Sequence, residues 1–337
     1  MAVDGGGWVT MGDVAERAGV SKITVSRVLR SPEKVRGETR ERVQAAIDAL
    51  GYVPDEAAGG LSSRRSRIVG AVISTLAGST FASTVDGLGA RLRRHGHQLL
   101  LAGTDYSSAK EADAVAAILG RRPDGLVLTS TTHTDGTRSI LKASRVPVVE
   151  IWELPADPIG YAVGFSNRDA GRAMALHLLA TGRHRPAFVG TAGEGDRRGR
   201  LRYEGFAEGL GEAGIAEARA AAPSADSHTV RGARGLAAVL ERWPDTDAIF
   251  CASDALALGA LSEAKRRGLR VPDDIAIAGF GDFEFAGESG LGLTTVRIPG
   301  SQIGEAAAQL ILDVNAGTPP DRRTIDVGFE VVARSTT

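Results

Sequence analysis

Cysteine is almost absent from this chain of 337 residues, in which Cys251 is the only one. A disulfide within the chain is therefore impossible, and a metal site built on cysteines is not expected. No apolar run approaches the ~18–20 residues that a membrane-spanning helix requires. The first twenty residues also lack the charged-then-apolar pattern of a secretion signal. These absences predict a cytoplasmic protein that makes no contact with a membrane.

The chain lacks an excess of either charge, since 40 Lys+Arg stand against 41 Asp+Glu. A uniformly basic coat for nucleic acid is therefore excluded, although a local basic patch is not. Residues 1–67 carry 11 Lys/Arg and 9 Asp/Glu, and the remaining residues carry 29 and 32. This small asymmetry has the sign expected of an N-terminal head that meets phosphates.

The signatures of several enzyme classes are also missing. The sequence contains no Walker loop, no G-x-S-x-G elbow, no H-E-x-x-H and no dinucleotide fingerprint after a predicted strand. None of the six histidines has the spacing of a metal site. We therefore expect no catalytic activity, no bound metal and no cofactor.

Two regions of different character make up the chain. Helical periodicity predicts three short helices over residues 11–17, 22–29 and 39–50. Residues 58–67 form a Gly/Ser/Arg-rich stretch that is typical of a linker. We therefore expect a head over residues 1–54, a hinge or linker over 55–67 and a core over 68–337.

The core alternates short apolar strands with amphipathic helices, and its fold class is α/β. Continuous apolar strands joined by helices favour parallel sheets that are covered on both faces. The core has roughly 270 residues, which is more than one doubly wound sheet usually needs. We therefore expect two similar α/β lobes with a cleft between them. The expected strands cover residues 68–74, 98–103, 125–129, 146–151, 187–190, 248–252 and 275–279.

The head has the pattern of a helix-turn-helix. Thr10 is placed to cap the first helix, with Asp13 three residues later as in a capping box. Gly19 can adopt the left-handed conformation that a sharp turn needs, and Ser21 is placed to cap the second helix. Two short helices joined by a glycine turn form the motif whose second helix enters the major groove of DNA.

The predicted second helix turns a set of polar and basic residues outward. Lysine and arginine reach guanine edges or phosphates, and isoleucine contacts a thymine methyl. The alternative from spacing alone is an ordinary helical hairpin with a solvated charged face. The outward positions are Lys22, Ile23, Ser26 and Arg27.

A long stretch of the head resembles that of LacI-family transcription repressors. The matching residues are VTMGDVAERAGVSKITVSRVLR and, after a short interval, TRERVQAAIDALGYVP. This resemblance implies a homodimer that binds a palindromic double-stranded operator. It implies DNA contacts by Thr10, Ser21, Lys22, Ile23, Thr24, Ser26, Arg27, Arg36, Thr39, Tyr52 and Leu61.

Three departures from the family pattern affect the hinge and the third helix. By the resemblance, Leu61 is the wedge that enters the minor groove and kinks the operator. Asp55 replaces the usual hinge asparagine, and Gly59-Gly60 lowers helix propensity by ~1 kcal/mol at each position. Arg36 replaces a serine that often caps the third helix, which favours a phosphate contact.

The core resembles the family's two-lobed domain, which is similar to periplasmic sugar-binding proteins. This resemblance implies an N-lobe of about residues 68–165 and 298–323 and a C-lobe of about 166–297 and 324–337. Residues 272–280, PDDIAIAGF, are common to most of the family. Residues 130–134, 147–150 and 162–167 resemble the gluconate-operon repressors, which implies a sugar-acid effector.

A sugar acid needs a guanidinium for its carboxylate, polar groups for its hydroxyls and an aromatic ring for its carbon chain. Arg202, in the stretch R-L-R-Y-E-G-F, aligns with the family's effector-contacting arginine. The alternative is a surface charge run, because Arg197, Arg198 and Arg200 crowd the same stretch.

The other expected effector contacts follow predicted strands or align with family positions. Phe81 matches a ligand-facing position, Glu150 aligns with an effector-contacting acid, and Ser253 and Asp254 follow a strand, where open α/β sheets bind ligands. The respective alternatives are core packing for Phe81 and helix capping for Asp254. The remaining candidates are His133, otherwise a solvated loop residue, and Asp282, one residue after the family's usual acid position.

Together these features predict a ligand-gated transcription repressor of a carbohydrate operon. The resemblance implies release from the operator when gluconate or a related sugar acid binds between the lobes. The alternatives are the same regulator with a neutral sugar, a phosphorylated sugar or a nucleobase as effector, or a solute-binding protein. No heptad extension follows the core, which favours a dimer over a tetramer.

Overall fold

The computed structural model describes residues 8–54, 66–75, 81–190, 196–225, 227–287 and 290–337. It divides into two compact units, Met1–Ser66 and Arg67–Thr337, which are described separately below. Within these described ranges, every helix is too short or too polar to span a bilayer.

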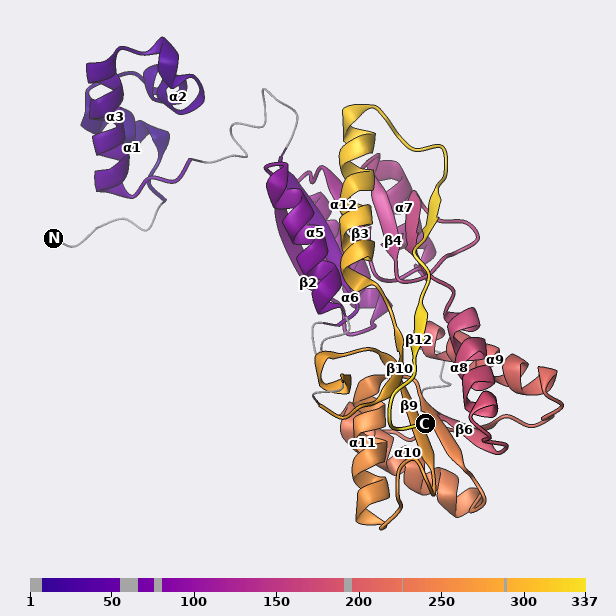
Figure 1. The fold of residues 1–337 in the computed structure, drawn as a ribbon. Coiled ribbons are helices and arrows are strands. Elements are labelled where there is room, and N and C mark those ends of the chain that lie inside the picture. The colour runs from indigo at the N-terminus through magenta and orange to yellow at the C-terminus, as the bar shows by residue number, and fades with distance from the viewer. Residues whose placement is uncertain (1–7, 55–65, 76–80, 191–195, 226, 288–289) are drawn as a thin grey trace. The chain divides into compact units, whose positions relative to one another are not determined.

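Within residues 8–54, the first unit contains three α-helices and one 3-10 turn (Figure 1). Helix α1 (Met11–Ala18) begins with the predicted capping box, because the Thr10 hydroxyl accepts from the backbone N–H of Asp13 and the Asp13 carboxylate accepts from the Thr10 N–H. Helix α2 (Lys22–Arg30) begins at Ser21, whose hydroxyl accepts from the Thr24 N–H. The predicted caps of both helices are therefore present.

The turn between α1 and α2 depends on glycine and on a distant arginine. Gly19 has φ 63°, the left-handed conformation predicted for it. Arg42, on helix α3 (Gly37–Leu50), donates to the Ala18 carbonyl at 2.8 Å and so ties the turn to α3. The 3-10 turn η1 (Pro32–Lys34) leads into α3, which begins two residues before the predicted start. The three helices enclose a small core of Val14, Val25, Val43, Ile47 and their neighbours.

The second unit contains two sheets, as expected for two α/β lobes (Figure 1). The first sheet has the order β11-β5-β4-β3-β1-β2, and all of its pairs are parallel. Its strands are β1 (Ile68–Ile73), β2 (Gln98–Gly103), β3 (Gly125–Leu128), β4 (Val148–Ile151), β5 (Tyr161–Gly164) and β11 (Thr324–Asp326).

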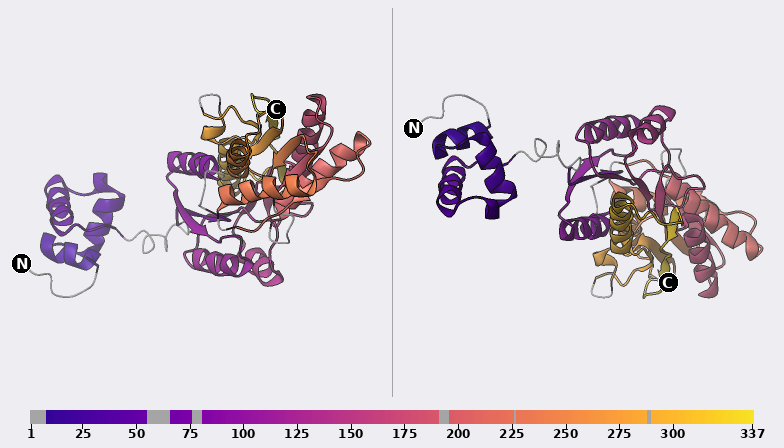
Figure 2. Two further views of the ribbon diagram at one scale, coloured as in Figure 1. Left: turned by 90° about the horizontal axis from the view of Figure 1, so that it is seen from below. Right: turned by 90° about the horizontal axis from the view of Figure 1, so that it is seen from above.

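Both faces of the first sheet are covered by helices, as Figure 2 also shows. Helices α5 (Ala82–Arg94) and α12 (Gly300–Ala316) pack together on one face, and α6 (Ser108–Leu119) and α7 (Asp135–Ser144) lie on the other. Along β3, Val127 packs into the α5/α12 core, whereas Leu126 and Leu128 pack into the α6/α7 core. This two-sided burial explains why the strand reads as a continuous apolar run.

The second sheet has the order β12-β10-β9-β8-β6-β7 and is parallel except for the antiparallel pair β10 and β12. Its helices are α8 (Asn167–Ala180), α9 (Arg197–Glu212), α10 (His228–Arg242) and α11 (Asp254–Arg266), with the 3-10 turn η2 (Glu284–Ala286) after β9. Its strands are β6 (Pro186–Val189), β7 (Arg219–Ala221), β8 (Ala248–Cys251), β9 (Ala276–Gly281), β10 (Thr294–Arg297) and β12 (Glu330–Val332).

The predicted lobe boundary at residue 324 needs a correction. Strand β11 (Thr324–Asp326) pairs with β5 in the first sheet, so this segment belongs to the N-lobe. The chain enters the second sheet only at β12, where Glu330 pairs with Arg297. Because β11 is three residues long and only partly apolar, its periodicity gives no sign of the sheet that it joins.

Candidate functional site

The first candidate site is the outward face of α2. Lys22, Ile23 and Arg27 are exposed, whereas Val25 and Val28 point into the core of the head. Ile23 is 70% exposed, which is unusual for an isoleucine and leaves its side chain free for an apolar contact. The combination of two cations and one exposed aliphatic side chain on a single helix face suits both phosphates and base edges.

The remaining DNA-contact candidates occupy different environments. The hydroxyls of Thr10 and Ser21 serve as helix caps, and Thr24 and Ser26 are half-buried on α2. Tyr52 is only 6% exposed and packs in the core of the head. Leu61 lies outside the described residues, as do Asp55 and Gly59-Gly60.

Two further candidates lie at the start of α3. Arg36 is exposed at the N-cap position and makes no side-chain capping bond, which leaves its guanidinium available for a phosphate. Thr39 is half-buried in the first turn of the same helix. The predicted DNA contact of each of the residues from Thr10 to Leu61 stays a prediction.

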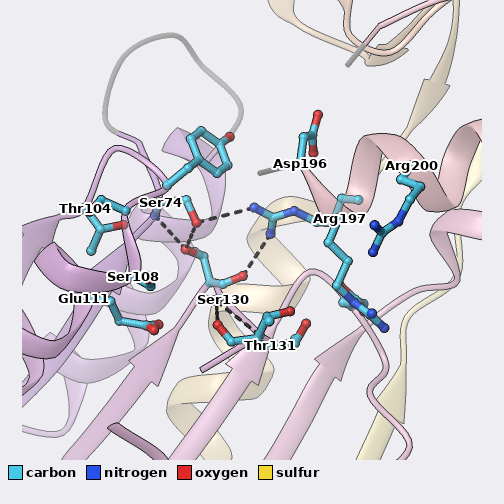
Figure 3. A pocket seen from close by; sticks show the side chains of 15 residues that line it. Ser74, Thr104, Ser108, Glu111, Ser130, Thr131, Asp196, Arg197 and Arg200 are labelled. Atoms are coloured by element: carbon cyan, nitrogen blue, oxygen red, sulfur yellow. Dashed lines mark hydrogen bonds and ion pairs between the residues drawn. The ribbon is translucent and has the colours of Figure 1, made fainter. Parts of the chain in front are cut away.

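The second candidate site is a cleft in the second unit, with side chains from both lobes. Its outer part is a cavity of about 350 Å³ (Figure 3). Thr104, Ser108 and Glu111 line one side of it, and Asp196, Arg197 and Arg200 line the other. Further hydroxyl groups come from the ends of parallel strands and the loops after them, at Ser74, Thr104, Ser107, Thr129, Ser130, Thr131 and Thr132.

The inner part of the cleft is a smaller cavity of about 100 Å³ with aromatic walls. It shares Tyr106, Asp196 and Arg198 with the outer cavity, so the two parts adjoin. Three of the predicted effector contacts line this inner part, namely Phe81, Arg202 and Ser253. The ring of Trp152, which also lines it, meets Phe81 edge-on at 5.1 Å between centroids.

Arg198 joins the two lobes across the cleft. From α9 it donates to the Thr129 carbonyl at 3.0 Å and the Ser74 hydroxyl at 3.5 Å, both beyond the ends of N-lobe strands. Its guanidinium also lies 5.2 Å from the centroid of the Phe81 ring. Within the described ranges, none of these partners is a carboxylate, whereas the neighbouring Arg197 is paired with Glu153 at 2.6 Å.

Arg202 lies deeper, with 8% of its surface exposed. One terminal nitrogen donates to the Asn167 side-chain oxygen at 2.5 Å, and the guanidinium lies 4.2 Å from the Phe280 ring centroid. Its Nε is buried and has no hydrogen-bond partner among the described residues. Burial lowers the pKa of Arg202 to about 10, so the group stays protonated at neutral pH. A buried cation with an unmatched donor is costly unless a ligand completes its contacts.

Four other predicted contacts do not line either part of the cleft. His133 and Glu150 form a buried group with Glu111, in which His133 Nδ1 is 3.1 Å from Glu111 Oε1 and Nε2 is 3.3 Å from Glu150 Oε1. The two carboxylates raise the pKa of His133 to about 9 against the opposing effect of burial. The alternative of a solvated loop histidine is wrong, because Glu111 and Glu150 enclose the side chain, and the predicted effector contact of His133 stays a prediction.

Asp254 and Asp282 support the second lobe instead of facing a ligand. Asp254 is buried and accepts from the Thr295 hydroxyl at 2.6 Å and the Phe283 N–H at 2.7 Å. Burial raises its pKa to about 6. Asp282 forms ion pairs with Arg297 and Arg334. The helix cap at this point is the Ser253 hydroxyl, which accepts from the Leu256 N–H.

The raised pKa of His133 predicts a loss of stability at alkaline pH. A group whose pKa is higher in the folded state stabilises the fold fully below its ordinary pKa, here 6.5, and this contribution is lost as the pH rises through about 9. We expect urea unfolding to show a free energy of unfolding lower by about 1–2 kcal/mol at pH 9 than at pH 6.5. His133→Gln should flatten this dependence, whereas His184→Gln, at an exposed loop, should leave it in place.

Several residues of the cleft were missed by sequence reasoning. Glu153, Asp196 and the hydroxyl residues of the outer cavity received no prediction, and Arg198 was treated only as a crowded neighbour of Arg202. One available signal was the run of polar residues directly after β3, at 129–132. Within the described ranges, the side chains of His, Cys, Asp and Glu form no group of three that could hold a metal ion.

Comparisons with known proteins identify the two domains of the chain. Residues 10–55 match the family of bacterial regulatory proteins of the lacI type, and residues 175–337 match a periplasmic binding protein-like domain. The HTH-type transcriptional regulator GntR of Pseudomonas aeruginosa is 37% identical over 334 residues, which cover 97% of this chain and 95% of that protein.

Two solved structures extend the likeness to the fold. A LacI-family transcriptional regulator from Silicibacter pomeroyi has a TM-score of 0.89 at 35% identity, over 97% of this chain and 99% of that one. The lac repressor dimer bound to operator and the anti-inducer ONPF has a TM-score of 0.82 at 27% identity, over 98% of this chain and 99% of that one.

Proposed function

The chain belongs to the LacI family of DNA-binding transcriptional repressors, and on that premise we propose that an anionic, polyhydroxylated effector such as gluconate releases it from its operator. The observation that carries this proposal is the composition of the cleft. Arg198 and Arg202 face it beside a wall of serine and threonine hydroxyls, and their guanidinium groups donate to neutral oxygens of Thr129, Ser74 and Asn167. Asp196 and Glu153 also attract Arg202 electrostatically.

The position of the arginines suits a carboxylate. Arg198 is in the first turn of α9, where backbone N–H groups and the helix dipole also favour an anion. Arginine binds a carboxylate through two parallel hydrogen bonds, which fix the ligand's orientation. The carboxylate of an open-chain sugar acid is placed at Arg198 and Arg202, with its hydroxyls toward Ser74, Thr104 and the 129–132 loop.

Arg198 also couples effector binding in the cleft to operator affinity. Because Arg198 holds the ends of β1 and β3 from the second lobe, a ligand that takes over its hydrogen bonds changes the contacts between the lobes. In the proposed mechanism this shift separates the paired hinges and lowers operator affinity. Reciprocity requires operator DNA to weaken effector binding by the same factor.

A homodimer is part of this proposal, and strand β2 supports it. It stands at the edge of the first sheet, paired only with β1 among the described strands. Leu101 on this strand is 38% exposed, and Leu99 and Leu100 are partly exposed. An exposed apolar edge strand is a liability in a monomer, and a second copy of the chain would cover it.

The alternative effectors differ in charge. A phosphorylated sugar would accept hydrogen bonds from more of the guanidinium N–H groups. A neutral sugar or a nucleobase would leave the guanidinium groups without an anion. A solute-binding protein is the weaker alternative, since it gives no role to the helix-turn-helix head.

Calorimetric titration tests the effector class. We expect saturable binding of gluconate and no heat with glucose, because only gluconate offers a carboxylate to Arg198. Arg198→Ala should weaken gluconate binding by about tenfold or more, the effect of losing a charged hydrogen bond. Arg242→Ala removes the same charge from an exposed position outside the cleft and should have no effect. Equal heats from glucose and gluconate would contradict the sugar-acid assignment.

A further inference from the structure

Glu111, His133 and Glu150 form a buried group in which an imidazole lies between two carboxylates. The side chains are 4%, 0% and 1% exposed respectively. The imidazole lies between the two carboxylates, with Nδ1 3.1 and 3.2 Å from the two oxygens of Glu111 and Nε2 3.3 Å from Glu150. Both ring nitrogens therefore serve as donors, which requires the protonated imidazolium.

Only one member of this group reaches the cleft. Glu111, in the first turn of α6, lines the outer cavity, whereas His133 and Glu150 lie behind it. Glu150 is fixed in turn by the Ile159 N–H, which donates to its Oε2 at 2.6 Å. The order of contacts runs from the backbone of residue 159 through Glu150 and His133 to Glu111 at the cavity wall.

The group suits the hydroxyl end of a ligand. One imidazolium stands between two carboxylates, so the group keeps a net negative charge and Glu111 remains a hydrogen-bond acceptor, while the cations of the same cavity are on the other side at Arg197, Arg198 and Arg200. Each carboxylate oxygen has two acceptor sites, so Glu111 keeps capacity for a hydroxyl donor after its contacts with Nδ1. The hydroxyl residues around it, Ser107, Ser108 and Thr132, line the same cavity.

We propose that Glu111 accepts a hydrogen bond from a hydroxyl of the effector, and that His133, backed by Glu150, is the positioning residue that holds Glu111 in place. This inference rests on the proposed function, because it assigns a further residue of the same effector site. Glu111 selects for a hydroxylated ligand, while Arg198 and Arg202 bind its anionic group.

A double-mutant cycle on gluconate binding by the full-length protein tests this inference. Glu111→Gln should weaken binding by about tenfold, because it removes a charged acceptor. His133→Gln should weaken binding by a similar factor. The double variant should bind gluconate as well as the single variant of lower affinity does, because His133 acts through Glu111. Asp113→Asn removes the same charge from an exposed position of α6 and should leave the affinity unchanged.

The outcomes separate this inference from the proposed function. Wild-type protein that binds neither gluconate nor another sugar acid would overturn the proposed function and the role of Glu111 with it. Wild-type affinity in Glu111→Gln would overturn the role of Glu111, and with it this inference, while leaving the proposed function in place. Penalties of the two single variants that multiply in the double variant would overturn the positioning role of His133. If His133→Gln fails to fold by circular dichroism, Glu150→Gln replaces it and should weaken binding only while Glu111 is present.

Discussion

Replacing Gly205 with alanine should lower the free energy of unfolding by about 3 kcal/mol, the upper end of the cost of overpacking a core. A Cβ at this position would lie 1.7 Å from the Arg168 carbonyl oxygen of α8. The obstacle is backbone, so no side-chain rotation relieves it. The converse contact is equally close, because a Cβ on Gly171 of α8 would lie 1.9 Å from the Arg202 carbonyl oxygen. Urea unfolding at neutral pH measures the change.

The Gly205→Ala substitution should also weaken effector binding in the cleft. Helix α9 carries Arg198 and Arg202, so moving it away from α8 displaces both guanidinium groups and weakens effector binding. Gly211→Ala is the matched control on the same helix, since a Cβ there meets nothing within 4 Å and alanine raises helix propensity by ~1 kcal/mol. Equal stability of Gly205→Ala and wild type would show that the two helices are not packed this closely.

Arg27→Ala should weaken operator binding by about tenfold or more for each half-site while leaving effector binding intact. Arg27 is exposed on the outward face of α2, and a bidentate contact of arginine with guanine contributes about 1–3 kcal/mol of discrimination. Fluorescence anisotropy with a duplex selected from random sequence by the wild-type protein measures the change. The proposed homodimer would contact two half-sites, so the dissociation constant of the full operator should rise by the square of the factor for one half-site.

Two comparisons define the role of Arg27. A loss confined to the selected duplex assigns the side chain to a base edge, whereas an equal loss on unrelated DNA assigns it to a phosphate. Arg121→Ala, an exposed arginine at the end of α6, removes the same charge outside the head and should bind the duplex as wild type does. Unchanged operator affinity of Arg27→Ala would remove Arg27 from the interface.

Local signals predicted much of the fold. The caps at Thr10 and Ser21 and the left-handed turn at Gly19 are determined by residues within a few positions of one another. The seven predicted strands are all present within two residues at each end, because central parallel strands are buried on both faces and read as apolar runs. The outer strands β7, β11 and β12 gave no such signal, since their residues are largely polar or half-buried. The inner strands β5 and β10 were also not predicted, because each has four residues that mix apolar positions with polar ones or glycine.

The cleft was predicted less completely, because its contacts join residues that are distant in the sequence. His133 was predicted as an effector contact or else a solvated loop residue, yet its partners stand 22 residues before it and 17 after it. Arg198 could not be separated from its neighbours by sequence, since its role depends on Ser74 and Thr129 in the other lobe. Of these arginines, Arg202 alone was selected on family resemblance, and it lines the inner cavity.

The central claim is that a sugar acid in the cleft controls the affinity of the head for DNA. The direct test is titration of a fluorescent operator duplex with the protein, with and without saturating gluconate. We expect the operator dissociation constant to rise by about 5–150-fold with gluconate, the usual range of allosteric coupling, and to stay the same with glucose. An operator affinity that stays the same while calorimetry shows gluconate bound would contradict the central claim.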